Sequence, residues 1–140
     1  MLGGFCMAHK IEELPVFQKA QEFSVAVTAI LQRSRLRKNS ELYKQIKEAN
    51  DSILSNMDEG FEQESDDGFA KYLYYAKGSI AEVMRRLRRA SARDEVPAID
   101  VNALGELSEP LGKMVGGFIK YLKRSGFKDR GRFRASHQRK

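Results

Sequence analysis

The sequence predicts an all-α protein, an antiparallel four-helix bundle whose helices run up, down, up and down. Three observations support this fold class. A chain of 140 residues is long enough for one core. Its strongly periodic segments all repeat apolar side chains at three- and four-residue spacing, and the joints between them are short and polar. We therefore expect a flexible segment at residues 1–13, the bundle at 14–124 and a disordered basic tail at 125–140.

The first two expected helices are each defined by one apolar face. The first runs from about Pro15 to Leu36, and proline suits its opening turn. Its inward residues are Ala20, Phe23, Ser24, Val27, Ile30 and Leu31. The second spans about Ser40 to Gln63, with Asn39 or Ser40 as its N-cap. Its inward residues are Leu42, Ile46, Ala49, Asn50, Ile53, Met57 and Gly60.

The third and fourth expected helices follow the same pattern. The third runs from about Asp67 to Arg93, with inward residues Phe69, Tyr72, Leu73, Ala76, Ile80, Val83, Leu87 and Ala90. The fourth covers about Asp100 to Arg124, with inward residues Leu104, Leu107, Leu111, Met114, Val115, Phe118 and Leu122.

Two features of the fourth helix predict departures from a regular rod. Pro110 has no backbone N–H and should kink the helix or split it into two pieces. A neighbouring helix should be able to approach closely along the side shared by Gly105, Gly112 and Gly116. We therefore expect an irregular fourth helix that packs tightly on its neighbour.

The net charge of +6 is unevenly distributed along the chain. Segment 41–68 is acidic, whereas segments 69–93 and 123–140 are strongly basic, and such asymmetry favours a polyanionic partner. Arginine forks suit phosphate oxygens, and tyrosine rings stack on unpaired bases. We predict that RNA or DNA contacts Lys71, Tyr74, Tyr75, Arg85, Arg86, Arg89 and Arg93 of the third helix, and Lys123, Arg124, Lys128, Arg130, Arg132 and Arg134 towards the C-terminus.

Two alternatives stay open at this point. The basic face could instead pair with an acidic surface of a neighbouring subunit or partner protein, without nucleic acid, and the tail could be only a solubilising extension. A polar stripe of Ser52, Asn56 and Glu59 has i, i+4 and i+7 spacing, which places the side chains one above another. We interpret this stripe as a structural polar network at a helix or subunit seam, with a ligand-contacting patch as the alternative.

The sequence argues against an enzyme. His9 and His137 lie outside the expected bundle, no Glu-x-x-His pair or glycine-rich phosphate loop is present, and Cys6 is the single cysteine. We expect no catalytic residue, no metal site and no cofactor, with an all-carboxylate site on the second helix as the remaining alternative. One cysteine fits a cytoplasmic location, and the longest apolar run is too short for a membrane span.

A set of residues spread over the first three helices carries a family resemblance. They are Leu14, Val16, Phe17, Lys19 and Ala20, then Gln45, Ile46, Ser52, Ile53, Asn56, Met57, Glu59 and Gly60, then Ser65, Phe69, Tyr72, Leu73, Ala76, Gly78, Ser79 and Glu82. Over roughly residues 12–125 the chain resembles the four-helix-bundle proteins encoded by intervening sequences in bacterial 23S ribosomal RNA genes. Asp58 stands where that family usually has a small apolar residue.

That family is related to the accessory protein of diversity-generating retroelements, which is strongly basic and associates with a reverse transcriptase and RNA. The arginines of the third helix and the basic tail favour this second branch. The resemblance implies a homo-oligomer, best taken as a pentamer, with a reverse transcriptase or a ribosomal component as a further partner and no membrane association.

Overall fold

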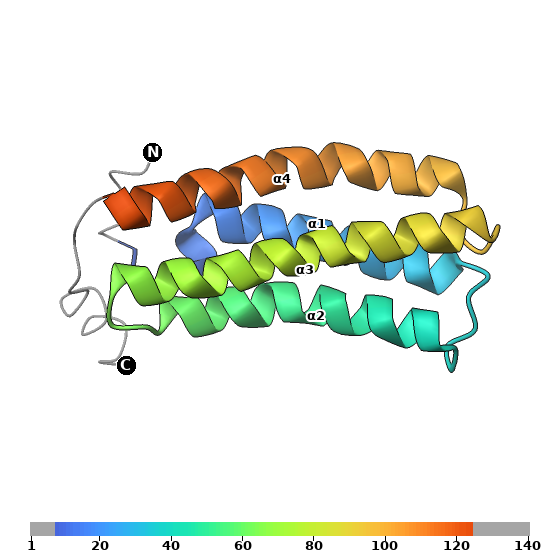
Figure 1. Ribbon diagram of the computed structural model, residues 1–140, viewed down its shortest axis with the longest axis horizontal. Coiled ribbons are helices and arrows are strands. Elements are labelled where there is room, and N and C mark those ends of the chain that lie inside the picture. The colour runs from blue at the N-terminus through green and yellow to red at the C-terminus, as the bar shows by residue number, and fades with distance from the viewer. Residues whose placement is uncertain (1–7, 125–140) are drawn as a thin grey trace.

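The computed structural model describes residues 8–124, which form a bundle of four helices (Figure 1). A short 3-10 helix, η2 (Ile11–Glu13), precedes α1 (Pro15–Arg33), α2 (Glu41–Phe61), α3 (Asp66–Ala92) and α4 (Ala98–Arg124). Figure 1 shows that successive helices run in opposite directions, and α1 also packs against α4. No strand occurs within the described part of the chain. The predicted all-α, up-down-up-down bundle is therefore confirmed.

Short polar side chains start the two middle helices. The Ser40 hydroxyl accepts a hydrogen bond from the backbone N–H of Tyr43 at 3.2 Å. Ser65 does the same for the N–H of Gly68 at 3.0 Å. Each serine satisfies one of the N–H groups that a first helical turn leaves without an intrahelical partner. Of the two caps expected for α2, the structure selects Ser40.

The turn between α3 and α4 caps the C-terminus of α3 with a backbone hydrogen bond. Asp94 has a φ of 58°, a left-handed conformation that aspartate tolerates better than most residues. The next N–H, that of Glu95, then reaches back to the carbonyl of Ala90 at 2.9 Å, which is the closure that ends many helices. The Glu95 carbonyl accepts from the N–H of Arg35 at 2.9 Å, so this turn also fixes the joint between α1 and α2.

The core agrees closely with the expected inward faces. Of the expected residues, only Ser24, Tyr72, Leu107 and Met114 are half-buried; the rest are buried. Buried Asn50, 3% exposed, donates from Nδ2 to the carbonyl of Ser24 at 3.1 Å and so links α2 to α1. Expected helix ends shift by a few residues; α1 stops at Arg33 rather than near Leu36, because Ser34 adopts an extended conformation and hydrogen-bonds back to Leu31.

The N-terminal boundary of the bundle differs from the expectation of a flexible segment up to residue 13. Ala8 and Ile11 are buried in the same core as the helices, and η2 leads directly into α1. The N–H of His9 donates to the Glu13 carboxylate at 3.0 Å. Part of the segment therefore belongs to the bundle.

The expectation that Pro110 splits the fourth helix is wrong. α4 is continuous from Ala98 to Arg124 and bends only gently (Figure 1). Pro110 lies on the exposed face, where water can hydrate the carbonyl that its missing N–H leaves free. Leu104 and Leu111, on either side of it, are both 1% exposed and hold the two halves against the same core. None of the helices within residues 8–124 is both long and apolar enough to cross a membrane.

At Gly60, α2 and α3 are in close contact. A Cβ atom built on Gly60 would lie 2.8 Å from Cβ of Tyr72 and 2.9 Å from Cδ1 of Phe69. Cβ of Tyr72 is fixed to the backbone of α3, so it cannot rotate away. Only glycine fits this position without moving a helix.

We predict that Gly60→Ala destabilises the protein by about 1–3 kcal/mol, because overpacking forces α2 and α3 apart. The matched control is Gly78→Ala, since a Cβ at Gly78 meets nothing within 4 Å. The control should be neutral or more stable by up to about 1 kcal/mol, through the higher helix propensity of alanine. Urea unfolding followed by circular dichroism compares the two; equal effects of both substitutions would contradict the close-approach argument.

Candidate nucleic-acid interface

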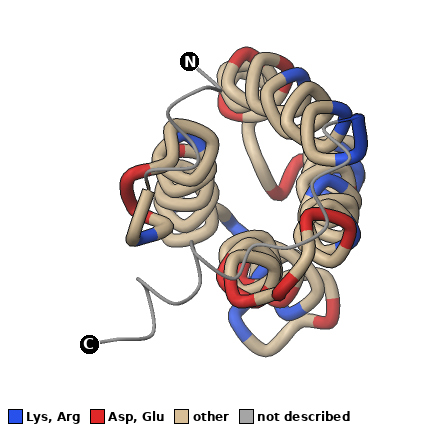
Figure 2. Tube along the Cα trace, turned by 90° about the vertical axis from the view of Figure 1, so that its left-hand side faces the viewer, with Lys and Arg blue, Asp and Glu red and all other residues tan. Residues whose placement is uncertain are grey.

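The outer face of α3 presents exposed arginines. Arg85 and Arg89 are exposed one turn apart, and Arg88 beside them is exposed as well. Lys71 and Tyr74 lie towards the other end of the same face, also exposed. Figure 2 views the bundle end-on and shows Lys and Arg positions gathered on its α3 side. This part of the predicted surface is therefore open to a large partner.

Arg86 is different from its neighbours, because it is half-buried and already paired within the chain. Its Nε donates to Oε2 of Glu82 at 2.9 Å and its Nη1 donates to Oε1 of Gln45 at 2.6 Å. The guanidinium thereby ties α3 to α2. Its Nε and Nη1 are engaged by these two partners, which leaves less of this guanidinium for a phosphate than in its exposed neighbours.

Two further residues of the predicted surface have partners of their own. Arg93, at the C-terminal cap of α3, lies with its Nε 3.2 Å from Oε1 of Glu95. The Tyr75 ring packs edge-on against the Tyr72 ring, with centroids 5.6 Å apart, and remains 48% exposed. Both side chains still reach solvent, but part of each is used locally.

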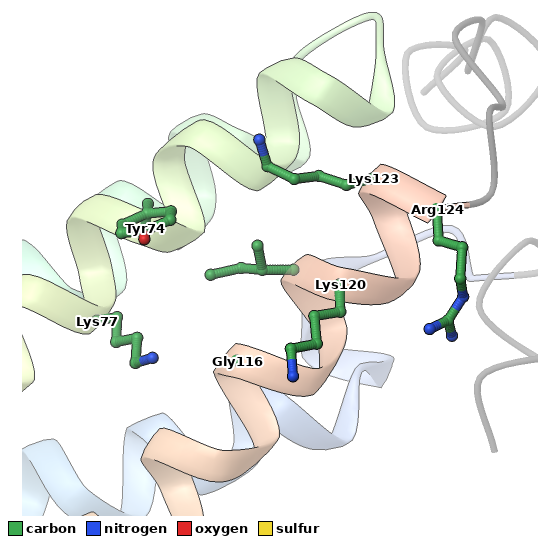
Figure 3. A pocket seen from close by; sticks show the side chains of 7 residues that line it. Tyr74, Lys77, Gly116, Lys120, Lys123 and Arg124 are labelled. Carbon is green, nitrogen blue, oxygen red and sulfur yellow. The ribbon is translucent and has the colours of Figure 1, made fainter.

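A shallow groove runs between α3 and α4, and Tyr74 joins it to the outer face of α3. One pocket in it has a volume of about 620 Å³ and is lined by Tyr74, Lys77, Gly116, Ile119, Lys120, Lys123 and Arg124. A second, of about 500 Å³, shares three of these residues and extends the groove along α4; it is lined by Lys77, Ser108, Glu109, Gly112, Lys113, Gly116, Gly117 and Lys120. Figure 3 shows Lys77 reaching from α3 towards Gly116, Lys123 reaching towards α3, and Arg124 pointing away.

The expectation that the glycines of α4 let a neighbouring helix approach closely is wrong. A Cβ at Gly112 would meet nothing within 4 Å, one at Gly105 would meet only the tip of Met84 at 3.9 Å, and one at Gly116 would meet only the Lys77 amine at 3.5 Å. The missing side chains therefore leave open space, which becomes the groove.

Three lysines of this groove, Lys77, Lys113 and Lys120, are absent from the residues predicted as an interface. Each alone looks like an ordinary exposed helix residue. The sequence did contain one signal for the groove. Lys113 and Lys120 are seven residues apart, so they lie on one side of α4, next to the side that carries the glycines.

The polar stripe on α2 is divided by the structure. The hydroxyls of Ser52 and Ser79 are 2.6 Å apart, which joins α2 to α3, and Ser52 also donates to the carbonyl of Ala49 at 2.8 Å. Asn56 donates to the carbonyl of Ser52 at 2.8 Å. Glu59, by contrast, is exposed and lies in a separate pocket at the end of α2.

That end of α2 carries a concentration of acids. A pocket of about 460 Å³ is lined by Lys10, Ile11, Glu12, Asp58, Glu59, Phe61 and Glu62. Partial burial, followed by the charges of Glu12 and Glu62, raises the pKa of Asp58. Within residues 8–124, no three His, Cys, Asp or Glu side chains are grouped so as to hold a metal ion.

The tail residues predicted to bind nucleic acid, Lys128, Arg130, Arg132 and Arg134, lie outside the described residues. Lys123 and Arg124 are described, and both are exposed in the last turn of α4. There their charges also interact favourably with the C-terminal end of the helix dipole.

Comparison with known proteins places this geometry in context. The model of a protein family described as 23S rRNA-intervening sequence protein matches residues 12–117. Among solved structures, the chain is similar to a protein of unknown function from the S23 ribosomal protein family of Bacteroides thetaiotaomicron VPI-5482. That similarity has a TM-score of 0.67 at 21% sequence identity and covers 75% of this chain and 98% of the other. A comparison with curated proteins gives no match.

We predict that Asp58→Asn stabilises the protein at neutral pH. The raised pKa means that the folded protein disfavours the charged carboxylate, so stability falls as pH rises from the ordinary value of 3.8 through the raised value. The gain from the substitution should therefore be present near neutral pH and vanish below the ordinary pKa. Thermal unfolding of both proteins across this pH range measures it.

The matched control for Asp58 is Asp51→Asn on the same helix. Asp51 pairs with Lys47 at 3.0 Å, so its neutralisation should bring no gain at neutral pH. An Asp58→Asn variant that is no more stable than the wild type at neutral pH would contradict the argument.

Proposed function

Because the chain belongs to the 23S rRNA-intervening sequence protein family, we propose that it is a non-catalytic accessory or scaffold protein that binds nucleic acid as a homo-oligomer. RNA or a ribonucleoprotein is the preferred partner, with DNA as the second. The observation that carries the proposal is the exposed basic surface of α3 and α4, with Arg85 and Arg89 at one end and Lys120 and Lys123 at the other.

The chemistry of this surface fits a phosphate backbone better than a base sequence. Guanidinium and ammonium groups are donors with a fixed positive charge, and both suit phosphate oxygens. Binding through them releases counterions from the nucleic acid, so affinity should depend strongly on salt and little on sequence.

Assembly into a ring is the second part of the proposal. The resemblance to intervening-sequence proteins supports a homo-oligomer, with a pentamer as the expected size. Exposed apolar side chains on the outer surface, Val25 at 69% and Ile99 at 76% exposed, are available for subunit contacts. A ring would present several copies of the basic surface to one polyanion, which raises avidity without any new contact.

The resemblance to retroelement accessory proteins extends the proposal to a partner protein. A reverse transcriptase bound to RNA is the partner that this branch supports, and a ribosomal component is the partner that the intervening-sequence branch supports. The protein would then act by holding nucleic acid near a catalytic subunit that it does not itself supply, in a cytoplasmic setting.

A protein–protein assembly module is the second candidate, favoured by one contact. Arg86 donates a hydrogen bond to Gln45 of α2, so an arginine of the basic helix contacts a polar group of the acidic helix within one chain. In an oligomer, Arg85 and Arg89 could make similar contacts to α2 of a neighbouring subunit.

We predict that Arg85→Glu/Arg89→Glu weakens binding of a labelled single-stranded RNA at least about ten-fold at about 50 mM salt, because two phosphate contacts become repulsive. The matched control, Lys44→Glu/Lys47→Glu, reverses two exposed charges on α2 and should retain most of the affinity. Fluorescence anisotropy measures binding, and light scattering measures the oligomer mass of each protein.

The two candidates give opposite results in this experiment. Loss of RNA binding with an unchanged oligomer mass supports the nucleic-acid proposal. Loss of the oligomer with RNA binding intact supports the assembly module. A wild-type protein without measurable RNA affinity would overturn the proposal.

A further inference from the structure

The groove between α3 and α4 has a floor and a rim of different chemistry. Its floor contains Ile119 together with the open backbone of Gly112 and Gly116, which carry no side chain to fill the space. Its rim consists of Lys77, Lys113, Lys120 and Lys123, with Glu109 as the one acid among the residues that line the two pockets. A continuous path with a cationic edge is thus built from two helices.

The spacing of the lysines follows the length of the groove. Lys113 and Lys120 are about 10 Å apart along α4, since a helix rises about 1.5 Å per residue. Lys77 lies across from them on α3, where its amine is 3.5 Å from the position of a Cβ on Gly116. Ammonium groups on both sides at intervals suit a chain that carries an anionic group on every unit.

Tyr74, at the end of the groove, favours a nucleic acid over other polyanionic chains such as acidic peptides. Tyr74 is 62% exposed, although it lines the pocket together with buried Ile119. Figure 3 shows its ring near Lys77 and across from the last turns of α4. An exposed ring beside a cationic track stacks on an unpaired base, a contact that an acidic peptide cannot provide.

The position of the groove between two neighbouring helices favours one strand as its partner. Packed helices have axes about 8–10 Å apart, so the depression between two of them admits a single extended chain but not a double helix. Bases that are already paired and stacked could not reach the Tyr74 ring.

We propose that the groove between α3 and α4 is a binding track for the sugar–phosphate backbone of a single-stranded nucleic acid, held by Lys77, Lys113, Lys120 and Lys123, with one base stacked on Tyr74. This inference rests on the proposed function and gives it a site distinct from the arginines of α3. Lys120 and Lys123 lie beyond residue 117, where the family match ends, whereas Tyr74, Lys77 and Lys113 lie within it.

Filling the groove without changing charge tests the track directly. In Gly112→Leu/Gly116→Leu, leucine side chains start in open space or at ordinary contact distance, so the bundle should still fold, as circular dichroism would verify. We expect at least about a ten-fold loss of affinity for a short labelled oligouridine by fluorescence anisotropy. The matched control, Ala103→Leu, places a leucine on an exposed part of α4 outside both pockets and should bind like the wild type.

Charge and stacking are tested separately. Lys113→Gln/Lys120→Gln/Lys123→Gln should lower the slope of log affinity against log salt by about 2, because about 0.7 counterions are released per single-strand phosphate. Replacement of Lys19, Lys44 and Lys47 on α1 and α2 by glutamine is the matched control and should leave the slope unchanged. Tyr74→Ala should weaken binding roughly ten-fold, whereas Tyr74→Phe, which keeps the ring, should not.

The outcomes separate this inference from the proposed function. If the leucine and glutamine variants of the groove bind oligouridine like the wild type, and Arg85→Glu/Arg89→Glu does not, the track is overturned and the proposed function still stands. No binding of oligouridine or duplex RNA by the wild type overturns both. If the wild type binds a polyglutamate peptide as tightly as oligouridine, and the groove variants lose this binding, the groove is a site for acidic protein segments and the nucleic-acid track is overturned. If the groove variants lose affinity for duplex RNA as much as for oligouridine, the assignment to a single strand is overturned.

Discussion

The close packing of α2 on α3 is the constraint on which the rest of the structure depends. It begins at Gly60, where Cβ of Tyr72 and the Phe69 ring of α3 leave no space for a Cβ. It continues through the Ser52–Ser79 hydroxyl pair and ends at the Arg86–Gln45 hydrogen bond. These contacts fix the rotation of α3 about its own axis. Once that rotation is set, Arg85 and Arg89 must point away from α2, and Tyr74 and Lys77 must lie beside α4.

The same residue type serves opposite purposes on the two sides of α3. On the α2 side, Gly60 is required because a neighbouring helix occupies the space that a side chain would need. On the α4 side, Gly112 and Gly116 cost helix propensity, roughly 1 kcal/mol each relative to alanine, without gaining a close helix contact. The α4 glycines therefore give no packing benefit within this chain. In the proposed binding track, the space that they leave between the lysines is filled by the ligand.

The sequence predicted the helices and the core well, because both follow from a local period. Apolar spacing alone identifies buried residues such as Phe23, Ile53 and Leu87, and a serine before such a segment identifies a cap. The groove was not predicted, because it depends on the distance between two helices and not on the pattern within either. Glycine spacing is compatible with both a tight contact and a hollow, and only the relative position of α3 decides between them.

Charge shows the same limit of local reasoning. Counting residues along the chain separates acidic from basic segments, but it does not reveal that Arg86 is taken by Glu82 and Gln45, or that lysines from two helices meet at one groove. A charge contributes to recognition only if it is both exposed and near others of its sign. By that criterion the arginines of α3 and the lysine-rimmed groove are two cationic regions of the described surface, and Tyr74 lies on the same face of α3 as the arginines and also lines the groove. A polymer with repeated anionic groups can contact both at once, which a small anion cannot do, so the geometry favours an extended polyanion over a compact ligand.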